Sequence, residues 1–277
     1  MPSLRILLYG CGTQGQSIIE WMKADPLLLS TCTANHRLHT VSSPSSQGRN
    51  SDAEHGDIGA TGITRVNANT RCSDNHKTLQ TADPASACNV APQFLLVDDN
   101  PALWGSSICG YTVHPPESTI GRDPLPALCL IGNNEIRWCV LQHLKAMGHP
   151  WFEWRHPDAL VAPSSQIGAG TVVLQRAVLD TATRVGEGCL LNVGSMVGHH
   201  SQIGNAVHLA ANVTLGGGSH IEDGAFLGLG AIVLPGIRVG KHATVGAGSV
   251  VVRDVPDGAV VVGSPAHPIR RREKQIE

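Results

Sequence analysis

The sequence predicts an open α/β unit followed by a parallel β-helix, and two patterns carry this prediction. Near the N-terminus an apolar run at 4–9 leads into a glycine-rich turn and a helical pattern, which is how a parallel α/β sheet begins. From 161 to 251 an aliphatic residue recurs at every sixth position. This period is typical of a triangular solenoid with aliphatic residues stacked inside. We therefore expect an N-terminal domain over 1–150 and a β-helix domain over 156–277.

Composition and charge restrict the function classes. With 31 glycines and 4% aromatic residues, the chain suits a fold of tight turns better than one with a bulky core. The formal net charge of -2 provides no basic footprint, so nucleic-acid binding is disfavoured and small-molecule chemistry is favoured. The 8 cysteines lack metal-ligand or disulfide spacing, and no stretch approaches about 18 apolar residues. We expect reduced thiols, no metal, no membrane span and a cytoplasmic location.

The N-terminal elements follow in order along the chain. The turn at 10–15 fits the G-x-G-x-x-G spacing of a nucleotide-binding loop, although plain strand-to-helix turns share this spacing. Residues 31–92 are polar and contain no aromatic residue, so we expect a poorly ordered insertion, either without a role or acting as a lid. Strands are predicted at 94–99 and 127–132. The helix that follows should direct one face towards the sheet, formed by Ile136, Val140, Leu141 and Leu144.

The hexapeptide repeat defines the C-terminal domain. Its aliphatic residues run from Val161 to Val251, and each is followed four positions later by a small or β-branched residue. With three hexapeptides to a coil, the repeat predicts a little over five coils. The left-handed sense is inferred from known proteins with this repeat, because the general rule for parallel crossovers gives the opposite hand.

Two histidines stand out within the repeat. His199 occupies the third position of its hexapeptide, where a side chain points outward, and a neutral imidazole accepts a proton near neutral pH. His208 lies nine residues further on and is expected on another face of the prism. A single chain does not bring these faces together, whereas prisms packed side by side in a trimer do. The alternative is that both are ordinary surface histidines.

At these residues the chain resembles the bacterial nucleotide-amino-sugar N-acetyltransferases of the bacillosamine and perosamine type. They are grouped with the hexapeptide-repeat sialic-acid O-acetyltransferase-like proteins. The segments that carry the resemblance cover the chain outside the insertion, and they are 6–17, 97–105, 131–137, 156–168, 192–217 and 261–270.

The resemblance implies a homotrimer that transfers an acetyl group from acetyl-CoA to the amine of a UDP- or other NDP-4-amino-deoxy sugar in bacterial surface-glycan biosynthesis. His199 matches the general base, and no metal is required. The positions that match the nucleotide-sugar site are Gly12, Thr13, Gln14, Asp98, Asp99 and Asn133. Those that match the acetyl-CoA site are His208, contributed across the subunit boundary, Gly217, Leu229, Ala247 and Pro265.

The chain departs from this family at two positions, and two other functions stay open. His200 stands where the family has Asp or Glu beside the catalytic imidazole, and Gln14 stands where histidine is common. An O-acetyltransferase of the same fold would need a stronger base, because an alcohol is less nucleophilic than a neutral amine. A non-catalytic trimeric scaffold that only binds a nucleotide sugar is favoured by the missing carboxylate. A His199→Ala variant separates enzyme from scaffold.

Overall fold

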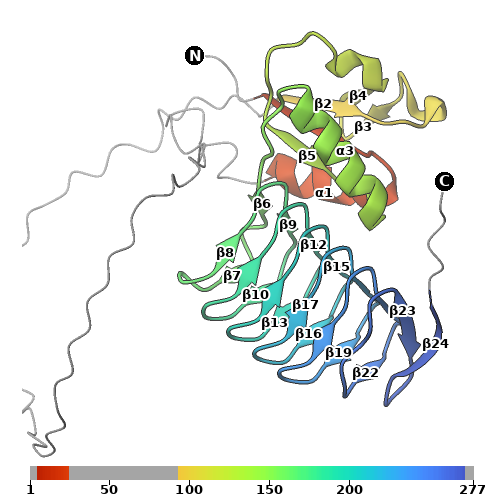
Figure 1. The fold of residues 1–277 in the computed structure, drawn as a ribbon. Helices are drawn as coiled ribbons and strands as arrows, with labels where there is room; N and C mark the ends of the chain where they lie inside the picture. The colour runs from red at the N-terminus through yellow and green to blue at the C-terminus, as the bar shows by residue number, and fades with distance from the viewer. Residues whose placement is uncertain (1–4, 25–92, 272–277) are drawn as a thin grey trace, which may run out of the picture. The chain divides into compact units, whose positions relative to one another are not determined.

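The structure, a computed structural model, describes residues 5–24 and 93–271. The insertion predicted at 31–92 lies outside these residues. The described chain forms an α/β sheet and then a parallel β-helix, which is coloured from green to blue in Figure 1.

The N-terminal part is a mostly parallel sheet with helices between its strands. Its elements are β1 (Arg5–Tyr9), α1 (Thr13–Ala24), β2 (Gln93–Val97), the 3-10 turn η2 (Pro101–Leu103), β3 (Ser107–Ile108), β4 (Tyr111–His114), the 3-10 turn η3 (Pro116–Thr119), β5 (Ala127–Cys129) and α3 (Asn134–Ala146). The strand order is β3-β4-β2-β1-β5, with an antiparallel pair only between β3 and β4. The carboxyl ends of β1, β2 and β5 therefore meet at one edge, where ligands bind in sheets of this type.

Helix α3 buries most of the face that its apolar pattern predicts, but not Ile136. Leu141 and Leu144 are buried as expected, but Ile136 is 50% exposed. The buried face also carries Asn134 and Arg137, whose side chains donate hydrogen bonds to backbone carbonyls of the β-helix. Buried polar groups need such partners, so these bonds set the rotation of the helix. An apolar periodicity does not reveal that constraint.

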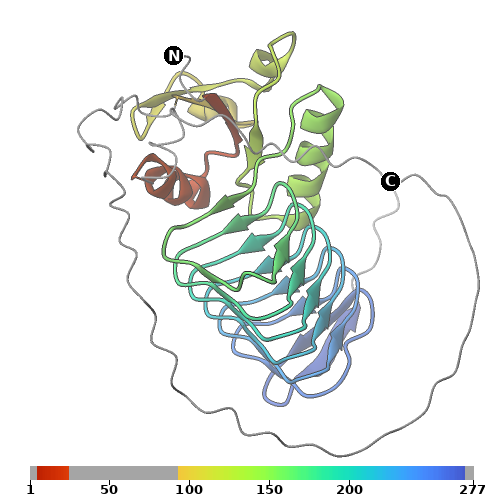
Figure 2. The same cartoon turned by 90° about the vertical axis from the view of Figure 1, so that its left-hand side faces the viewer.

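The β-helix consists of short strands that stack into three sheets, here called faces I, II and III, and Figure 2 shows the coils stacked on one another. Face I contains β7 (Leu160–Val161), β10 (Val178–Leu179), β13 (Met196–Val197), β16 (Thr214–Leu215), β19 (Ile232–Val233) and β22 (Val250–Val251). Face II contains β8 (Gln166–Ile167), β11 (Arg184–Val185), β14 (Gln202–Ile203), β17 (His220–Ile221) and β20 (Arg238–Val239). Face III contains β6 (Trp154–Arg155), β9 (Val172–Val173), β12 (Leu190–Leu191), β15 (His208–Leu209), β18 (Phe226–Leu227), β21 (Thr244–Val245), β23 (Ala259–Val262) and the antiparallel β24 (His267–Arg271).

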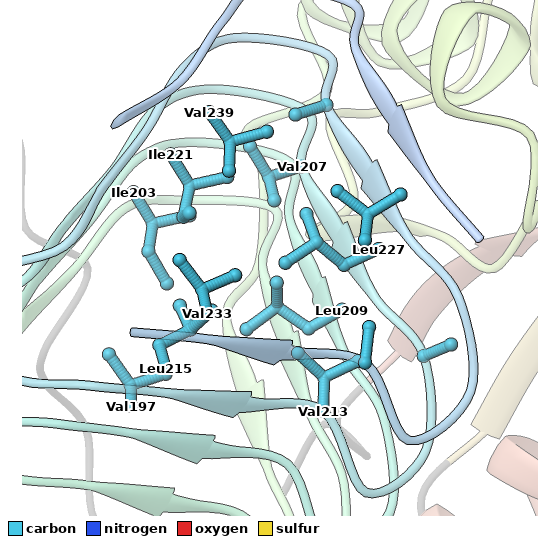
Figure 3. Packing of buried hydrophobic residues seen from close by; sticks show 14 of the residues in the cluster. Val197, Ile203, Val207, Leu209, Val213, Leu215, Ile221, Leu227, Val233 and Val239 are labelled. Atoms are coloured by element: carbon cyan, nitrogen blue, oxygen red, sulfur yellow. The ribbon is translucent and has the colours of Figure 1, made fainter. Parts of the chain in front are cut away.

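The interior of the prism is filled by the aliphatic residues of the repeat. Figure 3 shows Val197 and Leu215 of face I stacked near Leu209 of face III, and all three are at most 1% exposed. Small residues that follow each corner, such as Ser195 and Ser219, are also fully buried. Parallel pairing joins strands eighteen positions apart, as between β10 and β13. The predicted β-helix of hexapeptide repeats is thus confirmed.

Candidate functional site

A cavity of about 590 Å³ lies at the carboxyl ends of β1, β2 and β5, and Gly12, Asp98, Asp99 and Ile136 are among its lining residues. The turn that forms one wall requires glycine, because a Cβ at Gly15 would lie 2.1 Å from a backbone oxygen of the same turn. Helix α1 begins directly after this turn, with the backbone of 13–14 as its first residues. Such an N-terminus offers unpaired backbone N–H groups to a phosphate.

The two predicted carboxylates have different tasks in this cavity. Asp98 accepts backbone hydrogen bonds from Cys11 at 2.6 Å and from Asn100 at 2.9 Å, so it holds the glycine turn against the end of β2. Asp99 accepts a hydrogen bond from the hydroxyl of Tyr9. Burial and this carboxylate raise the pKa of Tyr9, which stays protonated as a donor. Asp99 is therefore the acid better placed to meet a ligand hydroxyl or base.

Asn133 directly precedes α3 and borders a second cavity of about 320 Å³, which is also lined by Phe226 and Thr244 of the β-helix. Its side-chain oxygen accepts hydrogen bonds from the backbone of Glu135 at 3.0 Å and of Ile136 at 3.1 Å. Asn133 thus caps the helix. Because the side-chain oxygen of Asn133 is used in this cap, its amide nitrogen is the atom available for the predicted contact with the substrate.

His199 lies at the corner between faces I and II, directly after β13, and its side chain is exposed. Its ring rests on the next coil: a Cβ at Gly217 would lie 2.6 Å from both Cε1 and Nε2 of His199. Its Nδ1 lies 3.2 Å from Nδ1 of His200. Gly198 must be glycine, since a Cβ there would lie 2.6 Å from the backbone nitrogen of Gly217. Two of the predicted site residues, His199 and Gly217, therefore lie in contact with each other.

His208 lies on face III but is covered by the loop before α3. Its side chain is 7% exposed, its Nδ1 lies 3.1 Å from the carbonyl oxygen of Gly132, and its ring meets Phe226 edge-on. Burial, with a further contribution from the charge of Arg137, lowers the pKa of His208 to about 4. The imidazole is therefore neutral at neutral pH and donates through Nδ1, while its buried Nε2 has no hydrogen-bond partner among the described residues. This location is separate from that of His199.

The other predicted acetyl-CoA positions lie at a second corner of the prism, between faces III and I. Leu229 and Ala247 follow β18 and β21 there, and Leu229 is 60% exposed. Pro265 lies in the turn between β23 and β24, after a cis peptide bond from Ser264. Within one chain, these residues and His199 lie on opposite edges of face I.

Sequence reasoning missed two charged residues near these sites. Arg137 is 1% exposed and donates to carbonyls on both α3's own loop and the β-helix. Its place on one helical face with Asn134 and Leu141 is the signal that could have revealed it. Asp180, one coil before His199, interacts electrostatically with it. Within 5–24 and 93–271, no group of three potential metal ligands is found, and no helix is long and apolar enough to cross a membrane.

The described chain is a parallel β-helix of hexapeptide repeats with an exposed corner histidine, and it follows an α/β sheet with a strand-end cavity. The family described as the hexapeptide repeat of succinyl-transferase matches residues 220–253.

One relative in sequence and two solved structures are similar to the chain. The chain is 32% identical over 134 residues to the GDP-perosamine N-acetyltransferase of Escherichia coli O157:H7, covering 48% of this chain and 52% of that enzyme. The chain thus spans about half the length of this curated relative. PerB from Caulobacter crescentus, solved with CoA and GDP-perosamine, has a TM-score of 0.67 at 24% identity, covering 96% of this chain and 97% of PerB. WeeI from Acinetobacter baumannii AYE has a TM-score of 0.69 at 22% identity, covering 96% of this chain and 100% of WeeI. These likenesses confirm the fold and the predicted resemblance.

Proposed function

We propose that this chain is an acetyl-CoA-dependent N-acetyltransferase that acts on the amine of a nucleotide-linked 4-amino-deoxy sugar. The observation that carries the proposal is the exposed imidazole of His199, held at a corner of the β-helix by His200 and Gly217. A neutral imidazole in such a position accepts a proton near neutral pH. The names of the relatives, with their CoA and GDP-perosamine ligands, support the same chemistry.

In the proposed reaction the neutral sugar amine attacks the thioester carbon of acetyl-CoA, and a C–N bond forms. His199 takes the proton that the nitrogen loses. The tetrahedral intermediate then breaks its C–S bond, and the same imidazolium returns the proton to the departing sulfur, which leaves as CoA thiol. The ring partner of His199 is an imidazole rather than a carboxylate. A neutral amine is a better nucleophile than an alcohol, so amine acetylation requires less of the base.

The nucleotide half of the acceptor is assigned to the cavity at the ends of β1, β2 and β5. The glycine turn and the N-terminus of α1 suit the diphosphate, and Asp99 suits a hydroxyl or base donor. Gly132 lines both this cavity and the smaller one beside the β-helix. His208 contributes to this site through its hydrogen bond to Gly132, which fixes the backbone between the two cavities.

We further propose a homotrimer of left-handed β-helices, because five of the six outward residues of face I are apolar. Its outward residues are Leu160, Val178, Met196, Thr214, Ile232 and Val250, and three of them, Leu160, Met196 and Ile232, are 67%, 47% and 41% exposed. The outward residues of face II are instead polar, namely Gln166, Arg184, Gln202, His220 and Arg238. A contiguous exposed apolar strip favours burial against another chain.

Packing on face I also completes the active site. His199 lies on one edge of this face, and Leu229 and Ala247 lie on the other. A neighbouring copy would therefore bring its own corner to His199, and acetyl-CoA would lie in the groove between the two. The cytoplasm suits these substrates, and the five described cysteines are all free.

The direct test is acetyl transfer to a panel of UDP-, GDP- and dTDP-4-amino sugars and their 4-hydroxy counterparts, followed as thiol release. We expect turnover with one amino sugar and a product that resists hydroxylamine, which cleaves esters but leaves amides intact. An ester product would instead identify an O-acetyltransferase. Binding of a nucleotide sugar without any transfer would identify a scaffold.

A further inference from the structure

The rings of His199 and His200 are neighbours in sequence and also in space. Their Nδ1 atoms lie 3.2 Å apart, and the ring centroids are 5.3 Å apart at an interplanar angle of 82°. A hydrogen bond between two imidazole nitrogens needs one proton, so one Nδ1 donates and the other accepts. Each neutral imidazole carries a proton on one nitrogen only. The direction of this bond therefore decides whether Nε2 of His199 carries a lone pair or a hydrogen.

The backbone holds both residues in this arrangement. His200 has φ 59°, the left-handed conformation, and its N–H donates to the carbonyl of Thr181 at 2.9 Å. The carbonyl of His199 accepts from Gly218 at 2.8 Å. Together with the contact on Gly217, these bonds tie the corner to the coils before and after it. Both side chains are exposed, and the ring of His200 lies against that of His199 at this turn.

We propose that His200 is a positioning residue for His199: its Nδ1 accepts the hydrogen bond from Nδ1–H of His199, which leaves the Nε2 lone pair of His199 for the acceptor amine. This inference rests on the proposed function. When His199 takes the substrate proton, the imidazolium keeps donating to neutral His200. A further proton on the pair would place two N–H groups against each other, so the pair holds one extra proton during turnover.

Among the residues that the structure describes, Asp180 is an ionisable group that interacts with this pair. The preceding coil contributes Asp180, whose carboxylate accepts from the backbone of Thr181 at 2.6 Å. Hydrogen bonds from the backbone and side chain of Thr181, with a smaller contribution from the charge of His199, keep the pKa of Asp180 below its usual range. Among the described residues the next coil contributes Gly217 and Gly218, which carry no charge. Asp180 therefore stays ionised throughout the working range.

Two substitutions at 200 separate hydrogen bonding from backbone strain. Asparagine and glycine both adopt the left-handed conformation readily, but only the asparagine side chain offers an oxygen that accepts from His199. We expect His200→Gly to lower kcat about tenfold or more with KM for both substrates nearly unchanged, and His200→Asn to stay within about threefold of wild type. His242→Gly is the matched control, since His242 also has a left-handed φ of 53° but lies on another corner.

A carboxylate at position 200 tests how a charge beside His199 affects catalysis. In His200→Asp the added negative charge favours the imidazolium, so the acid limb of the kcat/KM profile should move to higher pH by about one unit. Full activity of His200→Gly, or equal loss in His200→Gly and His200→Asn, would overturn the proposal.

Imidazole nitrogen NMR tests the positioning role separately from the proposed function, because the measurement needs no turnover. Histidine-labelled protein, with the His199 signal assigned from its loss in His199→Gln, should show the Nδ1–H tautomer in wild type. His200→Gly should shift it to the Nε2–H form. An Nε2–H tautomer of His199 in the wild type would refute the positioning role whatever the enzyme acts on.

Discussion

Substitution of Arg137 by methionine is predicted to loosen the connection between α3 and the β-helix. The guanidinium is 1% exposed, and its Nε donates to Gly188 at 2.8 Å while Nη2 donates to Ala206 at 3.0 Å and to Val207 at 3.4 Å. Each such bond contributes about 1–1.5 kcal/mol net, so the three together give about 3–4.5 kcal/mol. Burial lowers the pKa of Arg137, which offsets part of the gain while the arginine is present. Methionine removes the N–H donors, so the buried carbonyls of the β-helix lose their hydrogen-bond partners on Arg137.

Urea unfolding at a fixed protein concentration measures this loss, because oligomers gain apparent stability with concentration. The free energy of unfolding should fall by about 3 kcal/mol in Arg137→Met and by less in Arg137→Lys, whose single ammonium does not reproduce the planar fork. The matched control is Arg238→Met, which removes an exposed arginine paired with Glu222 and Asp257 and should change stability by less than about 1 kcal/mol. Equal, small effects of the Arg137 and Arg238 variants would refute the reasoning.

Three further predictions follow from the geometry. Gly217→Ala places a Cβ 2.6 Å from the ring of His199, so kcat should fall about tenfold or more, while the melting temperature should change little because Gly217 has no left-handed φ. The pKa of His208 near 4 lies below the value near 6.5 of an unfolded chain, so its contribution to stability is present above pH 6.5 and is lost as the pH falls towards 4. Urea titrations should show about 2 kcal/mol of this loss between pH 7 and pH 5 in wild type, and the loss should be absent in His208→Gln. Met196→Glu on face I should reduce the proposed trimer to smaller species in sedimentation, whereas Gln202→Glu on face II should not; an unchanged assembly in both would exclude face I as the interface.

The repeat made the β-helix predictable, because each aliphatic residue from Val161 to Val251 has a role that depends only on its position within six residues. The strand-end cavity was similarly accessible, since Gly12, Asp98 and Asp99 follow predicted strands and line it.

The parts that escaped prediction depend on contacts between distant segments. Arg137 bonds to residues 51 to 70 positions away, and those bonds turn Ile136 outward against its apolar pattern. His208 appears as an outward strand residue in the repeat, and only the loop that carries Gly132 buries it. The pairing of His199 with His200 depends on a left-handed backbone at 200. The repeat places this conformation at every sixth position from Gly170 to Gly248, but it does not specify that the ring of His200 meets that of His199.

Acetyl transfer by His199→Ala tests the central claim most directly. With the preferred amino sugar, kcat/KM should fall by about 10²–10⁴-fold, while the Kd for the nucleotide sugar should match that of wild type. His220→Ala, which removes another exposed histidine of the β-helix, should retain full activity. Wild-type turnover in His199→Ala would contradict the account, because it would show that the exposed imidazole at this corner does not carry the proton.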